Sequence, residues 1–355
     1  MRKPSVILIT VATIALLLVG FLSLRSPRPI VELKAETVTH IAGFPLTNTM
    51  ITSWIVIILL ASLAFFATRN MSLVPRGLQN FFEMALEALY NLVVNTAGEK
   101  HGRRFFPVIA TIFLYVVASN WLGLFPAVGT VGKVEEMKAE AEGGGEFLTE
   151  GFVFDQVGGL NVIMPGAPTW PPHEPASIEL EVADDAPLAE KEAALVEATK
   201  DLGKDEKAGL LIPFFRSINT DLNATLALAI MSAIFVEFWG ISALGFFRYG
   251  SKFLNLRNGP VGFFVGILEF VAEAARLLSF TFRLFGNIFA GEMLFLVILY
   301  LLPVIALDLV YGMELFVGVI QAFIFAMLTL VFGVIAVTSH EEGGEGHGSE
   351  PPAPA

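Results

Sequence analysis

The sequence predicts an all-α polytopic membrane protein with about five core transmembrane helices and a further apolar segment at its N-terminus. Three observations lead to this class. Of the 355 residues, 55% are hydrophobic and only 16% are charged, whereas soluble domains carry about 25% charged residues. Several apolar stretches reach the roughly 20 residues that a membrane-spanning helix needs. Cysteine is absent, which excludes a disulfide framework and a thiolate metal site.

Residues 1–25 begin with Arg2 and Lys3 and continue as an apolar run over 6–24. This pattern is typical of either a signal peptide or an uncleaved first span. The run is longer than the apolar region of an ordinary signal, and no small-residue cleavage site follows it. We favour an uncleaved anchor, with a cleaved signal as the alternative.

The segment 26–127 contains the first core spans. Apolar stretches over 47–68 and 105–126 each predict a spanning helix. Between them, 78–95 has apolar residues at helical spacing and two glutamates on another face, which indicates an interfacial helix. A soluble loop helix is the alternative interpretation.

The segment 128–212 differs in kind, because acidic residues outnumber basic ones by about three to one. Its start is rich in turn residues, and its charged end, around 184–207, is expected to be helical. Large apolar residues are few, so we expect no large independent core and interpret the segment as a solvated insertion.

The segment 213–340 contains the remaining helices. One span is expected over 218–246, followed by two long apolar runs, 262–302 and 304–338. The first run would be roughly 60 Å long as one helix, about twice the hydrocarbon thickness of a membrane. Each run therefore either breaks into two spans or forms one long, steeply tilted helix.

Polar side chains follow one face of each long run. On the first run, steps of three or four residues connect Glu269, Glu273, Arg276, Phe280, Arg283 and Asn287. On the second run, Glu314 and Gln321 are seven residues apart. An arginine in lipid costs at least ~2.5–3.5 kcal/mol, and its guanidinium does not lose its proton. We therefore expect Arg283 to face water or an anion, and such stripes are typical of ion paths.

These residues also resemble a known family. The stretch Arg283-Leu-Phe-Gly-Asn-Ile-Phe-Ala-Gly-Glu292 is similar to the signature of subunit a of F-type ATP synthases, and Gln321-Ala-Phe-Ile-Phe resembles its final-helix motif. Three further stretches resemble motifs of the same family and follow one another in the family's order: Arg104-Phe-Phe-Pro, Asn120-Trp-Leu-Gly-Leu-Phe-Pro126 and Thr220-Asp-Leu-Asn-Ala-Thr. The resemblance covers roughly residues 45–340.

The resemblance implies that Arg283 faces a rotating ring of c subunits, against which the last two helices pack as a tilted hairpin. A permanent charge there would keep two proton half-channels apart and attract an ionised ring carboxylate. The resemblance also implies that Glu292 and Glu314 line the outer half-channel, where many members have a histidine at one position. Two nearby carboxylates would titrate as a coupled pair.

Glu269 and Glu273 lie toward the cytoplasmic end and suit the inner half-channel. Asn287 and Gln321 are candidates for ordering water or orienting the arginine. Each assignment has a structural alternative. Glu273 could be a helix-surface partner of Arg276, Gln321 could join two helices by a hydrogen bond, and Arg283 could belong to a buried ion pair.

By resemblance, the partners are the c-subunit ring, subunit b of the peripheral stalk, the remaining ATP synthase subunits, membrane lipid and protons. Whether H⁺ or Na⁺ is carried stays open. We expect no nucleic acid, cofactor or metal. The chain has no G-x-x-x-x-G-K-[ST] phosphate loop, so we expect a non-catalytic subunit. The acidic insertion could alternatively be a docking lid over the outer ion entrance. Competing functions are a secondary transporter, which usually shows internal repeats, and a structural membrane scaffold.

Basic residues cluster in 69–104 and 248–257. The positive-inside rule places these loops in the cytoplasm, so the insertion is expected outside and the C-terminus inside a bacterial plasma membrane. The tail 341–355, rich in Glu, Gly and Pro, is expected to be disordered.

Overall fold

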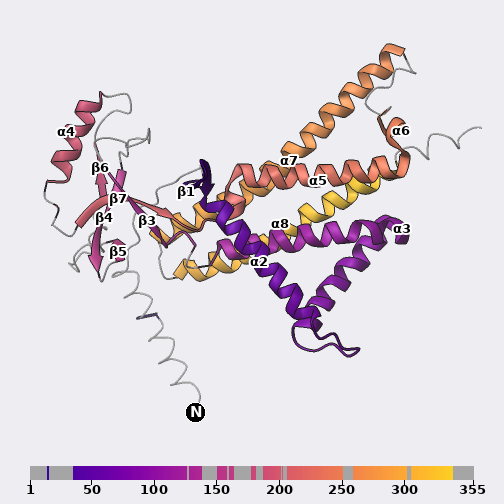
Figure 1. Cartoon of the computed structure of the whole chain (residues 1–355), viewed down its shortest axis with the longest axis horizontal. Helices are drawn as coiled ribbons and strands as arrows, with labels where there is room; N and C mark the ends of the chain where they lie inside the picture. The colour runs from indigo at the N-terminus through magenta and orange to yellow at the C-terminus, as the bar shows by residue number, and fades with distance from the viewer. Residues whose placement is uncertain are drawn as a thin grey trace, which may run out of the picture. The chain divides into compact units, whose positions relative to one another are not determined.

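The structure is a computed structural model of the whole chain (Figure 1). It describes residues 14–15, 35–125, 128–137, 150–157, 160–163, 177–180, 187–200, 202, 206–250, 259–301 and 305–338. The predicted N-terminal anchor, apart from residues 14–15, and the tail 341–355 therefore lie outside the described residues. The chain divides into two compact units, which we describe separately: Met1–Ser53, Trp121–Thr220 and Ile288–Phe316 form the first, and Trp54–Asn120, Asp221–Asn287 and Val317–Ala355 the second.

The first unit begins with a hairpin of β1 (Thr37–Ile41) and β2 (Phe44–Thr47), which pair antiparallel. Ala42 and Gly43 connect them with φ of 51° and 82°. Positive φ at both turn residues matches the twist of the two strands. Helix α2 (Asn48–Thr68) starts directly after this hairpin. The buried Asn48 side chain donates to the backbone oxygen of Pro213 at 3.3 Å, which ties the start of α2 to a later strand.

The acidic insertion contains a five-stranded antiparallel sheet. Its strands are β3 (Gly132–Glu136), β4 (Glu150–Val157), β5 (Leu160–Ile163), β6 (Ser177–Glu179) and β7 (Glu206–Pro213), in the order β3-β7-β4-β5 with β6 also paired to β4. Helix α4 (Leu188–Ala198) precedes the last strand, so the expected helical end is confirmed.

The sheet has a small core, whereas the sequence led us to expect no large independent one. Met137, Leu180, Leu195 and Ala208 form a buried apolar cluster. Three consecutive residues of β4, Phe152 to Phe154, are also buried. These few apolar side chains suffice because strand pairing satisfies the backbone groups of segments far apart in the sequence.

The second unit contains most of the helical bundle. Helix α3 (Leu78–Gly123) has a break at Gly98, whose φ of 73° and ψ of 162° are not helical. The break separates the predicted interfacial stretch from the predicted span, and the two segments pack closely. A Cβ atom added at Gly102 would lie 2.9 Å from the Cα of Val94, and the rings of Tyr90 and Phe106 are 5.1 Å apart.

Three helices follow the insertion's last strand and a short 3-10 turn, η1 (Ile218–Thr220): α5 (Leu222–Leu244), the short α6 (Phe246–Gly250) and the long α7 (Gly259–Leu301). Helix α8 (Ile305–Thr338) ends the described chain. Each of the two long apolar runs thus forms one continuous helix over its described residues, which excludes a break into two spans there; the steep tilt stays a prediction.

Trp239 holds three helices of the second unit together. Its indole stacks on the Phe105 ring of α3 with centroids 4.1 Å apart. A Cβ atom at Gly333 of α8 would lie 2.7 Å from the same indole, so only glycine permits this close approach. Nearby, the hydroxyls of Ser232 and Thr329 hydrogen-bond at 2.8 Å and join α5 to α8.

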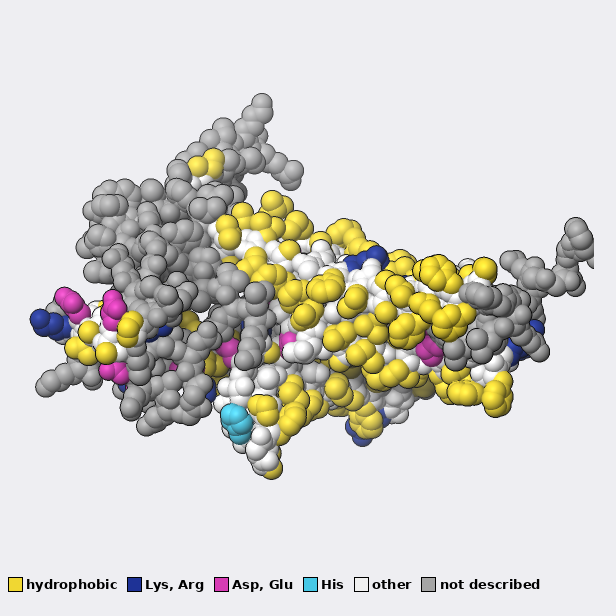
Figure 2. All heavy atoms as spheres, turned by 90° about the horizontal axis from the view of Figure 1, so that it is seen from above, with side chains coloured by type: hydrophobic (Ala, Val, Ile, Leu, Met, Phe, Trp, Pro, Cys, Tyr) yellow, Lys and Arg dark blue, Asp and Glu magenta, His cyan; other side chains and the backbone are white. Residues whose placement is uncertain are grey.

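Four of the described helices are long and apolar enough to cross a membrane: α2, α3, α5 and the part of α8 from Leu309 to Thr338. Hydrophobic side chains cover most of the helical surface visible in Figure 2. Exposed examples are Ile58, Phe66, Val261 and Phe264. Such a surface requires lipid or a protein partner, and the predicted class of an all-α polytopic membrane protein is confirmed.

Candidate functional site

The candidate residues fall into two groups, one in each unit. In the second unit, Arg283 lies on an exposed part of α7. Its neighbour Leu284 is fully buried, and Phe280, one turn earlier, is 7% exposed. Asn287, one turn later, is exposed like the arginine. Within the described part of the chain, the Arg283 guanidinium forms no hydrogen bond or ion pair. The alternative of a merely structural ion pair therefore finds no partner for Arg283 among the described residues.

Gln321 of α8 meets α7 at the position of the arginine. Its side-chain amide donates a 2.8 Å hydrogen bond to the backbone oxygen of Arg283, and the side chain is only 6% exposed. The bond joins two helices, as in the structural alternative. It also sets the position of Arg283 without neutralising its charge, so both roles expected for Gln321 are compatible with one contact.

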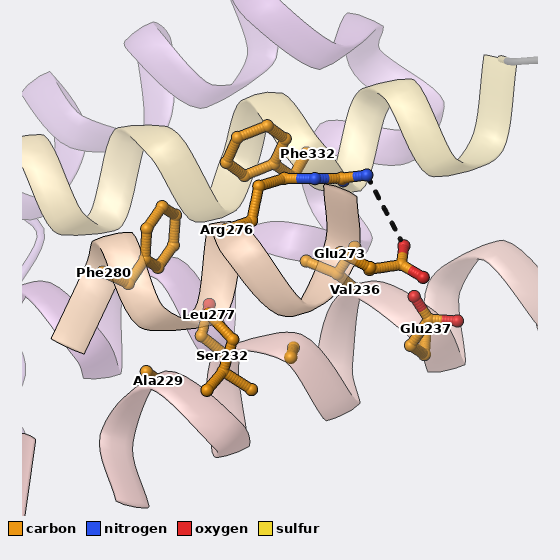
Figure 3. A pocket seen from close by; sticks show the side chains of 10 residues that line it. Ala229, Ser232, Val236, Glu237, Glu273, Arg276, Leu277, Phe280 and Phe332 are labelled. Atoms are coloured by element: carbon orange, nitrogen blue, oxygen red, sulfur yellow. Dashed lines mark ion pairs between the residues drawn. The ribbon is translucent and has the colours of Figure 1, made fainter. Parts of the chain in front are cut away.

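The N-terminal part of the stripe on α7 is a cluster of three charged side chains, Glu269, Glu273 and Arg276. The Arg276 Nη2 atom lies 3.4 Å from a carboxylate oxygen of Glu269 and 3.8 Å from one of Glu273. The Phe332 ring of α8 faces the guanidinium at 5.0 Å. Figure 3 shows Arg276 reaching across its helix toward Glu273. The structural pairing of Glu273 with Arg276 is thus present.

The stripe does not lie in one environment. Phe280 packs on the rings of Phe325 and Phe332 of α8, at 5.1 and 5.6 Å, whereas Arg283 and Asn287 are exposed. A spacing of three and four residues predicts a shared helix face, but it does not predict where the neighbouring helix covers that face.

In the first unit, Glu292 of α7 lies close to the turn before α5. The buried Arg216 acts electrostatically on its carboxyl, and the Thr220 hydroxyl is within hydrogen-bonding reach. The same hydroxyl donates to the Ser217 backbone oxygen at 2.8 Å, which holds it in the turn beside Glu292. The second oxygen of Glu292 is buried and without a hydrogen bond in the described structure.

Glu314 of α8 lies directly against α7. A Cβ atom added at Gly291 would overlap both oxygens of the Glu314 carboxyl, so glycine makes room for this side chain. Glu314 is 7% exposed. The groups that act on Glu292 are Arg216 and Thr220, and Glu314 is not among them. Coupled titration of the two carboxyls stays a prediction.

Several motif residues have structural roles. The Asp221 side chain accepts from the Asn223 backbone N–H at 2.9 Å and caps the start of α5. Asn120 donates to the backbone oxygen of Gly318 at 3.0 Å, within the second unit. In the first unit, the Trp121 indole N–H donates to the backbone oxygen of Leu315 at 3.1 Å. These contacts cap the start of α5 and hold the end of α3 against α8. They supply no ionisable group to a proton path.

Sequence reasoning did not assign a role to three residues that now lie beside the candidates. Arg216 faces Glu292. Glu237 of α5 lines one cavity with Glu273 and Arg276 (Figure 3), and Tyr249 of α6 lies beside Glu237. A carboxylate inside an apolar stretch was the available signal for Glu237. No local pattern points to Arg216 or Tyr249, because their partners are far away in the sequence.

The fold and these two groups define a polytopic membrane protein with ionisable side chains along its membrane helices. The family model of the ATP synthase A chain matches residues 50–333, which is most of the chain. The chain belongs to this family. It is accordingly a membrane-sector subunit of an ATP synthase complex.

Proteins named ATP synthase subunit a are similar along nearly their whole length. The one from Gloeobacter violaceus is 28% identical over 295 residues, covering 83% of this chain and 85% of the relative. The one from Moorella thermoacetica is 25% identical over 301 residues, covering 85% and 95%. The one from Helicobacter pylori (strain P12) is 26% identical over 308 residues, covering 85% and 96%.

Proposed function

We propose that this subunit supplies the fixed arginine and the two proton half-channels that couple proton flow to rotation of a c-subunit ring. The observation that carries the proposal is Arg283, an exposed cation on a long membrane helix that has no anionic partner among the described residues. A charge that cannot be discharged is costly in lipid. A mobile carboxylate on a neighbouring ring would compensate that cost.

The surface around Arg283 suits a close neighbour. Gly286 lies three residues further along α7, and nothing comes within 4 Å of a Cβ atom added there. Asn287 is exposed. Small residues let another helix approach closely. The ring carboxylate would release its proton as it meets the guanidinium, and the charge would stop protons from crossing directly between the half-channels.

The two groups of ionisable residues supply the proposed half-channels. Glu292 and Glu314, two largely buried carboxyls with different neighbours, would line the outer one. Glu269 and Glu273 would line the inner one, together with the cavity beside Arg276. Asn287 and Gln321 would hold the region around the arginine. The subunit itself would bind no nucleotide, and ATP formation would take place on other subunits.

The proposed partners are the c-ring, subunit b of the peripheral stalk and the remaining subunits of the complex. The proposed location is a bacterial plasma membrane, with the basic loops and the C-terminus in the cytoplasm. This orientation rests on the clusters of Lys and Arg in 69–104 and 248–257. The acidic insertion would then lie outside.

The test is Arg283→Ala in the assembled complex. Proton-driven ATP synthesis in membrane vesicles should be abolished, because the barrier between the half-channels and the attraction for the ring carboxylate are both lost. Arg283→Lys is the matched variant, which keeps a cation that can lose its proton when desolvated; it should support little synthesis. Wild-type synthesis by Arg283→Ala would refute the proposal.

A further inference from the structure

Three helices of the second unit line a small, half-open cavity whose walls are mostly apolar. Its volume is about 40 Å³, and its walls come from α5, α7 and α8 (Figure 3). The polar side chains among its lining residues are Ser232, Glu237, Glu273 and Arg276. A cavity needs about 10–15 Å³ of such volume to hold a water molecule. Water therefore fits between the carboxyl on α5 and the carboxyl on α7.

Two carboxyl side chains and one guanidinium line this cavity: Glu237 of α5, and Glu273 and Arg276 of α7. Arg276 lies 3.4 Å from Glu269 and 3.8 Å from Glu273. Arg104 of α3 does not line the cavity. Its guanidinium hydrogen-bonds the Ser242 hydroxyl at 2.6 Å and faces the Phe238 ring at 5.5 Å.

Glu237 and Glu273 thus line one cavity from two helices, α5 and α7. Two carboxyl groups that share a site large enough for water can pass a proton between them through that water. Arg276 cannot be the group that exchanges the proton. Its guanidinium keeps its charge and is held by two carboxylates and the Phe332 ring.

A buried phenol lies at the end of this cluster. The Tyr249 side chain is 2% exposed, and its ring rests where a Cβ atom of Gly240 would otherwise be. Burial raises the pKa of the Tyr249 phenol, and the neighbouring Glu237 and Glu273 carboxyls raise it further. The phenol therefore keeps its proton at neutral pH.

We propose that Glu237 is a proton-transfer residue of the inner half-channel, acting across the cavity that it shares with Glu273. The proposal rests on the proposed function and extends it to a residue on α5. A proton leaves the Glu273 carboxyl for cavity water, and that water passes a proton to the Glu237 carboxylate. Each step breaks one O–H bond and forms another. Glu237 then releases the proton to water on the cytoplasmic side.

The experiment measures passive proton flux through the complete membrane sector in liposomes, with flux normalised to the amount of incorporated complex. Glu237→Gln keeps the shape of the side chain but cannot titrate, and it should lower the flux about tenfold or more. Glu87→Gln removes an exposed carboxyl on α3 and serves as the matched control; its flux should equal that of the wild type.

A second variant separates transfer from packing. Glu237→His restores a titratable group, so flux should recover relative to Glu237→Gln, with its midpoint shifted toward the ordinary imidazole range near pH ~6.5. A purely structural role predicts no recovery. The double variant Glu237→Gln with Glu273→Gln should conduct no more slowly than the slower single variant, because both residues act in series.

The outcomes distinguish the two levels of the proposal. Wild-type flux in Glu237→Gln, or equal flux in the Gln and His variants, would overturn the role of Glu237. If Arg283→Ala still abolishes ATP synthesis in that case, the proposed function stands without this residue. If Arg283→Ala leaves synthesis unchanged, the proposed function itself fails.

Discussion

The side-chain amide of Gln321 donates a 2.8 Å hydrogen bond to the backbone oxygen of Arg283. The contact joins α8 to α7 at the level of the arginine and leaves the guanidinium exposed. A glutamine is suited to this position because it fixes the helix without adding a negative charge. The arginine remains available to an anion that comes from another chain.

Gln321→Leu tests this contact. The variant removes a helix-to-helix hydrogen bond, worth roughly 1 kcal/mol in a membrane protein, and keeps the Arg283 charge. We expect ATP-driven proton pumping to fall by a modest factor rather than to vanish. Asn80→Leu, which removes an exposed amide side chain of α3, is the control. Complete loss of pumping in Gln321→Leu, with normal assembly, would mean that Gln321 does more than hold α7.

Glu292→Ala and Glu314→Ala test the outer half-channel. Each variant removes one of the two largely buried carboxyls, so each should slow passive proton conduction in the intact membrane sector. Arg216 and Thr220 act on Glu292, whereas the Glu314 carboxyl lies against Gly291. We therefore expect the two single variants to lower proton conduction by different factors. If neither changes conduction, the outer path lies elsewhere.

Gly291→Ala tests the position of Glu314 without removing its carboxyl. A Cβ atom at this position would overlap the Glu314 carboxyl oxygens, so the side chain must move. Conduction should fall toward the level of Glu314→Ala. Gly312→Ala is the matched control, because nothing lies within 4 Å of a Cβ atom there. Equal conduction in both glycine variants would show that proton conduction does not depend on the exact position of the Glu314 side chain.

Excision of the acidic insertion tests whether it docks. Lys133 and Ile212 are cross-strand neighbours in the pairing of β3 with β7, so a two-residue Asn-Gly turn can replace residues 134–211. If the insertion is a solvated domain, assembly and passive proton flux should stay close to those of the wild type. Failure of the shortened chain to assemble would favour the docking lid.

The helices could be predicted because their signal is local. The runs 262–302 and 304–338 are too apolar for solvent and contain too few breakers to end early, and α7 and α8 occupy nearly the same residues. The exposed state of Arg283 followed from the cost of burying a permanent charge. Neither prediction depends on which helices pack against each other.

The sheet of the insertion could not be predicted in the same way. Its strands are short, and β3 pairs with β7, which is about 70 residues away in the sequence. The apolar residues 152–154 of β4 and 210–212 of β7 are local signals of buried strands. The acidic composition of the whole segment favoured a solvated insertion more strongly. The meeting of Glu237 with Glu273 is likewise non-local, since it depends on how α5 packs on α7.

The most direct measurement of the central claim is disulfide cross-linking between α7 and the c-ring. The chain contains no cysteine, so a single one can be placed at Gly286, where the added side chain meets open space, or at the fully buried Leu284. A second cysteine is introduced in the c subunit, next to the carboxylate that is proposed to meet Arg283. We predict a cross-link from Gly286→Cys and none from Leu284→Cys. Absence of a cross-link from Gly286→Cys in the assembled complex would contradict the account.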